Sequence, residues 1–183
     1  MERCLHPRYY AGRLYPCGKC PCCLSVRRDE LASRLYVEAC ASRCAYFITL
    51  TYEDGRLPFA DTEINCFDKV GVQVFIRSVR DFLRTKGISI RYFLTSEYGD
   101  SGNRSHYHML VYLSDFLSLQ QVYILFTEKW RQGIVYVTSI GMGAAKYVAK
   151  YCLKDDGSDI FEKGHPNKPF RLFSRRPGLG ATP

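Results

Sequence analysis

The sequence contains 183 residues, carries a formal net charge of +8, and is 46% hydrophobic and 14% aromatic. This length and composition suit a single domain with extensions around a hydrophobic core. No run reaches the ~18 consecutive apolar residues of a membrane-spanning helix, and no apolar run follows the first charged residues, so we expect neither a membrane protein nor a secreted one.

The positive charge is concentrated at the two ends of the chain. Residues 1–44 contain eight Lys and Arg against four Asp and Glu, and residues 160–183 contain five against one, whereas the middle is neutral. Two basic ends around a neutral core predict a phosphate-binding surface built from those ends. General solubility is the alternative explanation.

The hydrophobic pattern predicts alternating strands and helices behind a Cys-rich segment that has no clear period. In chain order, we expect a helix over residues 24–42, a strand over 45–52, a helix over 68–86, strands over 88–98 and 106–113, a helix over 118–131, a strand over 134–139 and a helix over 141–154. The last stretch is expected to be irregular or to cross back over the domain. This order predicts an α+β fold, with an antiparallel ferredoxin-like or RRM-like sheet and helices on one face.

Two histidines in one predicted strand are the first candidate site. His106 and His108 are two residues apart, so both imidazoles point to the same face of the sheet. Glu97 ends the preceding strand, and a hairpin would bring its carboxylate beside the histidines; Asp100 is a weaker candidate. Two imidazoles and a carboxylate suit a divalent metal. The alternative is a group of ordinary exposed polar residues.

Two tyrosines in the last predicted helix are the second candidate site. Tyr147 and Tyr151 are four residues apart and therefore share a helix face, beside a row formed by Lys146, Lys150 and Lys154. A phenol can serve as a nucleophile, and ammonium groups can neutralise a phosphate and lower the pKa of the phenol. The alternative is a packed tyrosine face beside solvated lysines.

The N-terminal cysteines have the spacing of a metal-binding knuckle. Cys17, Cys20 and Cys23 are separated by two residues each, and Cys4 can supply a fourth thiolate, which predicts a structural Zn²⁺ site. Other candidates for the fourth ligand are His6, Cys40 and Cys44. A set of free thiols is the alternative.

Five segments together resemble the HUH endonucleases, in which two histidines flank a hydrophobic residue. The resemblance is greatest to the replication initiation proteins of small single-stranded DNA phages, in the gokushovirus branch of the microviruses. The matching segments are residues 16–23 with Arg27 and Arg28, residues 47–52, residues 93–99 with 104–108, residues 147–154, and residues 174–180. Tyr107 departs from the pattern, because the family prefers a plain hydrophobic residue between the histidines.

The resemblance implies a rolling-circle replication initiator with an HUH nuclease fold. Such an enzyme is an endonuclease and ligase that nicks and rejoins single-stranded DNA through a 5′-phosphotyrosine intermediate. The implied active-site residues are Tyr147, Tyr151 and Lys150 as catalytic groups, and Glu97, His106 and His108 as ligands to Mg²⁺ or Mn²⁺. Further DNA contacts are expected from basic side chains, namely Arg27, Arg28, Arg104, Lys146, Lys154, Arg175 and Arg176.

The resemblance also implies partners and a division of the chain. We expect the protein to act on single-stranded DNA at a replication origin in the cytoplasm of a bacterial host, with a host helicase and polymerase. Residues 1–44 are expected to form a Cys-rich segment and a basic helix packed on the core. Residues 45–160 are expected to form the nuclease core, followed by a basic, Gly- and Pro-containing segment over residues 161–183.

Two other functions fit parts of the pattern. A plasmid relaxase uses the same chemistry, but its catalytic tyrosine often precedes the histidine pair, whereas here the tyrosines follow it. A non-catalytic RRM-like module would instead bind single-stranded nucleic acid by stacking bases on its sheet. The aromatic residues available for such stacking are Tyr46, Phe47, Tyr92, Phe93, Tyr107 and Tyr112.

Overall fold

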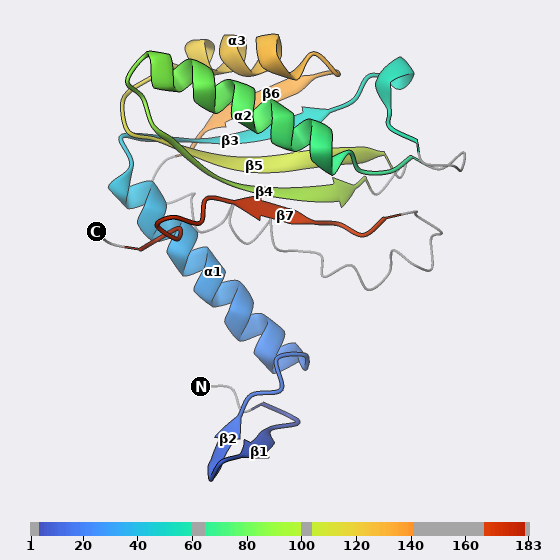
Figure 1. Ribbon diagram of the computed structural model, residues 1–183, viewed down its shortest axis with the longest axis vertical. Coiled ribbons are helices and arrows are strands. Elements are labelled where there is room, and N and C mark those ends of the chain that lie inside the picture. Colours follow the sequence, from blue (N-terminus) through green and yellow to red (C-terminus); the bar gives the residue numbers. More distant parts are fainter. Residues whose placement is uncertain (1–3, 60–64, 100–103, 141–166, 182–183) are drawn as a thin grey trace.

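The chain folds around a five-stranded antiparallel sheet, which Figure 1 shows beneath helices α2 and α3. The computed structural model describes residues 4–59, 65–99, 104–140 and 167–181. The strands of this sheet are β3 (Cys44–Thr51), β4 (Ile90–Tyr98), β5 (Ser105–Leu113), β6 (Val135–Ser139) and β7 (Arg171–Phe173). The helices are α1 (Pro21–Ala41), α2 (Lys69–Thr85) and α3 (Leu119–Trp130), and a separate hairpin is formed by β1 (Arg8–Tyr10) and β2 (Arg13–Tyr15).

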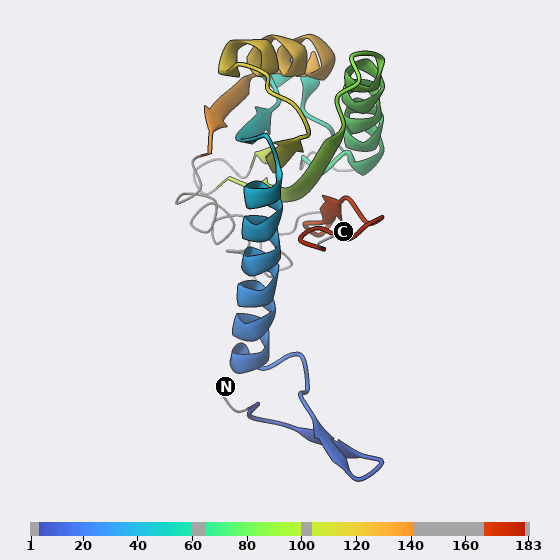
Figure 2. The ribbon, with the colours of Figure 1, turned by 90° about the vertical axis from the view of Figure 1, so that its left-hand side faces the viewer.

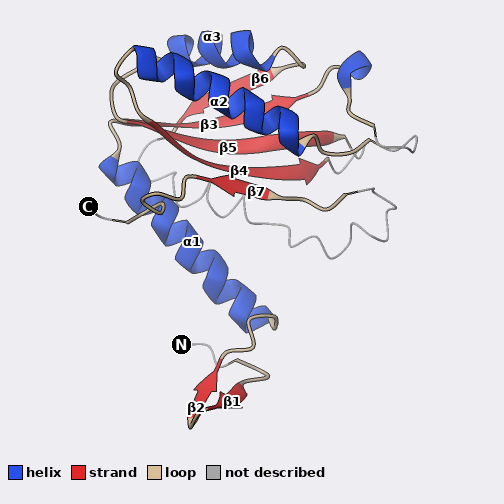
Figure 3. Ribbon diagram, in the orientation of Figure 1, coloured by secondary structure: helices blue, strands red, loops and turns tan. Residues whose placement is uncertain are grey.

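The order β3-α2-β4-β5-α3-β6 gives the ferredoxin-like topology that the hydrophobic pattern predicts. The strand order across the sheet is β6-β3-β5-β4-β7, and each strand is antiparallel to its neighbours. Figure 3 shows α2 and α3 together on one face. The predicted α+β fold class is therefore confirmed, whereas the helix predicted over residues 141–154 lies outside the described residues.

Local signals in the sequence explain where α2 and α3 begin and end. The carboxylate of Asp68 accepts a hydrogen bond from the backbone N–H of Gly71 at 2.8 Å, which caps the start of α2. Gly87, predicted to follow the end of α2, has a φ of 72°, in the left-handed region that favours glycine. Ser118 and Gln121 form a reciprocal capping box at the start of α3.

The sheet carries apolar clusters on both faces because its strands alternate. Ile48, Leu94 and Met109 face α2 and α3 and are almost completely buried in the larger cluster. On the other face, Phe93 and Leu110 pack in a smaller cluster against α1. The two clusters fix the register of the central strands, since a shift by one residue would exchange the two faces.

Helix α1 packs on the sheet with only its C-terminal part. Its buried residues there are Ala32, Leu35 and Glu38, whereas most of its N-terminal half is exposed. Figures 1 and 2 show α1 projecting away from the sheet and carrying the β1–β2 hairpin at its far end. The N-terminal module, defined here as residues 4–34, is thus held out from the body of the protein.

The C-terminal segment returns to the sheet, as one of the two expected outcomes stated. Strand β7 pairs with β4 at the sheet edge, with Phe93 opposite Phe173. Beyond it, Leu179 is buried in the cluster beneath α1. Among the described residues, no helix is long and apolar enough to cross a membrane.

Candidate metal centres

Three predicted metal ligands converge at one end of the central strands. In the pairing of β4 with β5, Glu97 lies directly opposite His106 and Thr95 lies opposite His108. Paired residues and residues two apart share a face, so Glu97, His106 and His108 all lie on the face opposite α2 and α3. Their candidate ligand atoms lie within 4.8 Å of one another, which confirms the predicted proximity.

The spacing of these atoms suits a single divalent cation. The Oε2 atom of Glu97 is 3.3 Å from Nε2 of His108 and 3.8 Å from Nε2 of His106. Two ligand atoms bound at ~2.1 Å to one ion, at roughly 90–110° to each other, are separated by about 3.0–3.4 Å. Small side-chain adjustments would therefore allow all three residues to bind one ion. Three ligands leave further coordination positions for water or phosphate oxygens.

The second nitrogen of each imidazole is held by a hydrogen-bond partner. Nδ1 of His106 lies 3.1 Å from the carbonyl oxygen of Arg104, and Nδ1 of His108 lies 3.0 Å from Oγ1 of Thr49. A carbonyl oxygen can only accept, so Nδ1 of His106 donates and its Nε2 presents a lone pair toward Glu97. The ring of Phe47 stacks on His108 with centroids 5.3 Å apart.

Sequence reasoning assigned no role to Thr49 or to the Arg104 carbonyl. Thr49 lies opposite His108 because of the β3–β5 register, which no local pattern specifies. The only signal was that residues 47–52 resemble a family motif. Positioning groups of this kind are visible only once the strands are paired.

Tyr107 occupies the position between the histidines and points to the opposite face of the sheet. Its ring is completely buried, and its hydroxyl lies 3.1 Å from that of Tyr52 and accepts the backbone N–H of Asp68 at 3.0 Å. The hydroxyl thereby has partners inside the core beside the start of α2. The departure from a plain hydrophobic residue is thus accommodated, because the hydroxyl is hydrogen-bonded.

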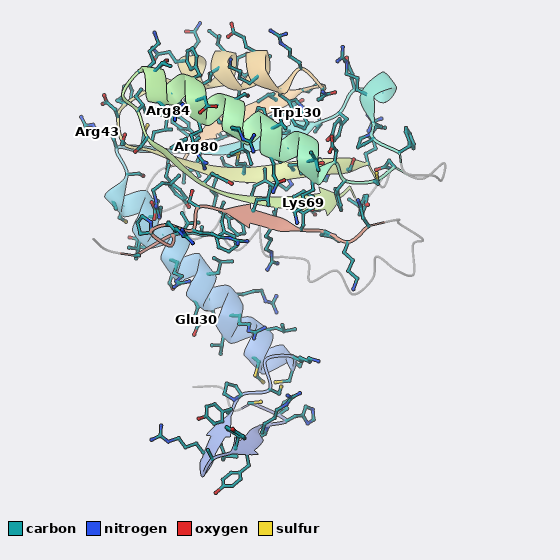
Figure 4. All side chains as sticks on the ribbon, in the orientation of Figure 1. Glu30, Arg43, Lys69, Arg80, Arg84 and Trp130 are labelled. Carbon is teal, nitrogen blue, oxygen red and sulfur yellow. The ribbon has the colours of Figure 1, made fainter. Side chains whose placement is uncertain are left out.

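The four cysteines predicted to bind zinc lie together beside the start of α1, where Figure 4 shows several sulfur atoms in yellow. The sulfur atoms of Cys17 and Cys23 are 3.9 Å apart, as are those of Cys4 and Cys20. Tetrahedral Zn–S bonds of ~2.3 Å place neighbouring sulfurs about 3.8 Å apart. The cluster therefore has the dimensions of a four-cysteine zinc site.

Backbone amides stabilise negative charge on this cluster. The N–H groups of Lys19 and Cys20 point to the sulfur of Cys17 at 3.4 and 3.3 Å and lower the pKa of that thiol. Amides of Leu5 and Cys23 lower the pKa of the Cys20 thiol to about 6. Thiolates are the form that binds metal, so this backbone suits a cation.

The alternative fourth ligands lie outside this cluster. His6 and Cys40 are exposed, and the sulfur of Cys44 donates to the carbonyl of Asp115 at 3.4 Å. Among the described residues, Cys4 is the thiol that joins the three cysteines of the knuckle.

The predicted DNA-contacting residues are spread over the molecule. Arg27 and Arg28 lie on α1, and the Arg27 guanidinium lies against Gly18 beside the cysteine cluster. Arg104 is paired with Asp54 and donates to the Tyr52 carbonyl, and Arg175 lies over the Phe173 ring. Arg176 is exposed, in the segment after β7. The residues outside the described part of the chain are Asp100, Lys146, Tyr147, Lys150, Tyr151 and Lys154.

The sheet does not present the aromatic platform that a non-catalytic RRM-like module would need. Tyr46 and Tyr107 are buried under α2 and α3, and Phe93 and Tyr112 are buried on the α1 face. Phe47 and Tyr92 are only partly exposed. Base stacking on these rings is therefore blocked by the protein's own core, and the expectation of such a platform was wrong.

The fold and the site define an α+β protein with a ferredoxin-like sheet that carries a two-histidine, one-carboxylate cluster. Residues 45–156 match the family model of the replication-associated protein ORF2, and the chain belongs to this family. The resemblance found in the sequence motifs is thereby confirmed.

Individual relatives come from phages. The chain is 29% identical to replication-associated protein VP4 of Bdellovibrio phage phiMH2K, over 93% of this chain and 57% of that protein. It is 28% identical to replication-associated protein ORF2 of Spiroplasma virus 4, over 84% of this chain and 52% of that protein. The chain thus spans about half the length of these relatives. Among solved structures, the hypothetical protein ORF119 of Sulfolobus islandicus rod-shaped virus 1 superposes with a TM-score of 0.43 at 21% identity, covering 69% of this chain and 96% of that one.

Proposed function

We propose that this protein initiates rolling-circle replication of phage DNA by nicking single-stranded DNA at the origin and remaining joined to the 5′ end. The observation that carries the proposal is the Glu97–His106–His108 cluster on the sheet of a chain that belongs to a family of replication-associated proteins. Ordinary exposed polar residues would not require two oriented imidazoles facing one carboxylate.

Glu97, His106 and His108 would hold Mg²⁺ or Mn²⁺, and the bound ion would polarise the scissile phosphate. Imidazole ligands favour Mn²⁺, whereas Mg²⁺ prefers oxygen ligands. Thr49 and the Arg104 carbonyl keep the imidazoles turned with Nε2 toward the carboxylate. The chain thereby arranges the ligands before the ion and the DNA arrive.

The nucleophile would be the phenol of Tyr147 or Tyr151, as the family resemblance implies. The phenol oxygen loses its proton and attacks phosphorus in line, a tyrosine–phosphate bond forms, and the bond from phosphorus to the 3′ oxygen breaks. The departing 3′ oxygen takes up a proton and can prime a host polymerase behind a host helicase. The second tyrosine can attack the regenerated junction after one round, which releases and closes the product. Lys150 would neutralise charge on the phosphate or the phenolate.

We further propose that Cys4, Cys17, Cys20 and Cys23 hold a structural Zn²⁺. The separations of 3.9 Å between sulfurs and the amides directed at two of the thiols support this assignment. A closed set of four protein ligands leaves no position for substrate, so the role would be to hold the N-terminal module in shape.

The test of the nicking proposal is covalent capture of DNA. Purified protein is mixed with labelled single-stranded origin DNA and either Mn²⁺ or EDTA, and the products are separated on a denaturing gel. We expect a metal-dependent protein–DNA band and a released fragment with a free 3′-OH. The variants His106→Ala/His108→Ala and Tyr147→Phe/Tyr151→Phe should both lose the band, whereas Tyr123→Phe, on the exposed side of α3, should keep it. A band that persists in the double tyrosine variant contradicts the assignment of the nucleophiles.

A further inference from the structure

The β1–β2 hairpin exposes its aromatic residues to solvent. Tyr9 and Tyr10 are 75% and 74% exposed, Leu14 is 68% exposed and Tyr15 is 46% exposed. All six residues of the two strands are exposed, so the hairpin side chains make no contribution to the buried core. Exposed rings gathered on one small element are a feature of interaction surfaces.

The pairing of the two strands alternates rings with positive charges. Arg8 lies opposite Tyr15, and Tyr10 lies opposite Arg13. Paired residues share a face, as do residues two apart, so these four side chains form one surface in which each ring has an arginine beside it. Such a surface offers flat rings for stacking and guanidinium groups for phosphates.

A cavity of about 430 Å³ lies between this hairpin and the start of α1. Leu14, Tyr15 and Val26 contribute apolar walls, and Arg27 and Glu30 contribute charged groups. Cavities that bind small organic groups have volumes of about 300–1,000 Å³ and combine apolar walls with a few polar groups. An unstacked nucleobase suits such a lining, because its faces are apolar and its edges form hydrogen bonds.

The charge around the hairpin favours a polyanion as its partner. Residues 4–34 contain six Lys and Arg, namely Arg8, Arg13, Lys19, Arg27, Arg28 and Arg34, against Asp29 and Glu30. A second copy of the chain would bring the same excess of positive charge to the contact and be repelled. Exposed rings further favour unpaired bases, since a duplex buries the faces of its bases.

We propose that the N-terminal module is a second binding site for single-stranded DNA, formed by Tyr10, Arg13 and Tyr15 and the adjoining cavity. This inference rests on the proposed function for the identity of the DNA, but not on the nicking chemistry. Helix α1 contains 21 residues and is ~30 Å long, a length equal to about nine nucleotides of stacked strand. The module at its far end would therefore bind nucleotides that are well removed from the bond that is cut.

The test measures affinity for fluorescein-labelled oligo(dT) by fluorescence anisotropy, with the full chain. Two lengths are used, about 10 nucleotides, comparable to one binding site, and about 40 nucleotides, enough to reach from one end of α1 to the other. We expect Tyr10→Ala/Arg13→Ala to bind the long oligonucleotide about tenfold or more weakly, with a salt dependence reduced by about one phosphate contact. Tyr10→Phe, which retains the ring, should keep the wild-type affinity.

The matched control removes an exposed tyrosine and an exposed arginine elsewhere. Tyr123→Ala/Arg84→Ala lies on α3 and α2 and should leave the affinity unchanged. Equal affinity of Tyr10→Ala/Arg13→Ala and wild type, absence of oligo(dT) binding by the wild type, or equal binding of duplex DNA would each overturn the proposal. So would a wild-type dimer that the variant converts to a monomer without loss of DNA affinity.

The same variants separate this proposal from the nicking proposal. Tyr10→Ala/Arg13→Ala should still form the covalent adduct with a short oligonucleotide that contains the cleavage site. If the wild type forms no adduct but the variant binds oligo(dT) more weakly than the control, the nicking chemistry fails while the second binding site stands. Circular dichroism and the metal content of the variants establish that the module is folded.

Discussion

At the scale of single residues, Thr49 is the side chain that connects the fold to the candidate metal site. Its hydroxyl lies 3.0 Å from Nδ1 of His108, on the side of the ring away from Glu97. Loss of a partner that orients a metal ligand typically weakens metal binding about 10–100-fold. We expect Thr49→Val to weaken Mn²⁺ binding by this factor, measured by isothermal titration calorimetry.

Thr85→Val is the matched control for this experiment. Thr85 is exposed at the end of α2 and its hydroxyl bonds only within the helix, to the carbonyl of Phe82. Its substitution should leave Mn²⁺ affinity unchanged. Equal affinities for Thr49→Val and wild type would show that the hydroxyl does not position His108.

A second prediction at this scale concerns the buried phenol of Tyr52. Burial raises the pKa of Tyr52 to about 12, above the value of about 10 in an unfolded chain. The folded state therefore holds this proton more tightly, so its contribution to stability is complete below pH of about 10 and is lost as the pH rises toward 12. We expect the urea midpoint to fall over this range.

Tyr52→Phe removes the titrating group and should flatten this dependence. The free energy of unfolding of both proteins, followed by circular dichroism between pH values of about 9 and 12, is the measurement. Identical slopes for the variant and the wild type would mean that other groups dominate the alkaline transition.

At the scale of elements, a buried ion pair joins α1, β4 and the C-terminal segment. Arg91 donates to both carboxylate oxygens of Glu38 and to the carbonyls of Pro177 and Gly178. The N–H of Gly180 donates to Oε2 of Glu38 at 2.8 Å. The segment over residues 174–180, which the sequence presents only as a family signature, is therefore held in place by this ion pair and by buried Leu179.

Removal of one partner should destabilise the fold strongly. Glu38 is 8% exposed, so Glu38→Gln would leave the Arg91 charge without its counter-ion. We expect a loss of about 3 kcal/mol in the free energy of unfolding, at the lower end of the usual range because the Arg91 side chain is 23% exposed. Urea denaturation measures this loss.

An exposed ion pair provides the control for this substitution. Asp81→Asn breaks the pair with Arg84 on α2, both partners of which are at least half exposed, and should cost less than about 1 kcal/mol. Glu38→Met/Arg91→Met should recover part of the stability lost in Glu38→Gln, since neither charge is left alone. Similar losses for Glu38→Gln and Asp81→Asn would refute the role of the buried pair.

At the scale of the whole molecule, the two candidate metal centres belong to different parts of the chain. The cysteine cluster lies where α1 begins, whereas the apolar clusters of the sheet involve only the C-terminal part of α1. We therefore expect Cys20→Ser to abolish zinc binding and to increase hydrogen exchange in residues 4–34. The exchange of β3, β4 and β5 should stay as in the wild type.

Hydrogen exchange with mass spectrometry and measurement of zinc content check this prediction together. Cys66→Ser, a cysteine outside the cluster, should retain zinc. A zinc-free Cys20→Ser protein whose sheet also loses protection would show that the metal supports the whole fold rather than the N-terminal module.

The sequence by itself determined the element order, the ferredoxin-like sheet and both sets of metal-ligand candidates. These features follow from local rules, because strand alternation places His106 and His108 on one face and the knuckle spacing brings three cysteines together. A single hairpin was enough to predict the position of Glu97. The roles of Tyr147 and Tyr151 rest on the family motif and stay predictions.

The tertiary structure alone decided which side chains surround those ligands and which rings remain exposed. Thr49, Glu38 and Arg91 meet their partners across strand registers and helix packing, at sequence separations that no periodic pattern encodes. Burial likewise depends on which element covers a surface. The sheet aromatics are buried under helices, whereas Tyr9 and Tyr10 project from a hairpin that nothing in the described residues covers, so the ability to stack bases moves from the sheet to the N-terminal module.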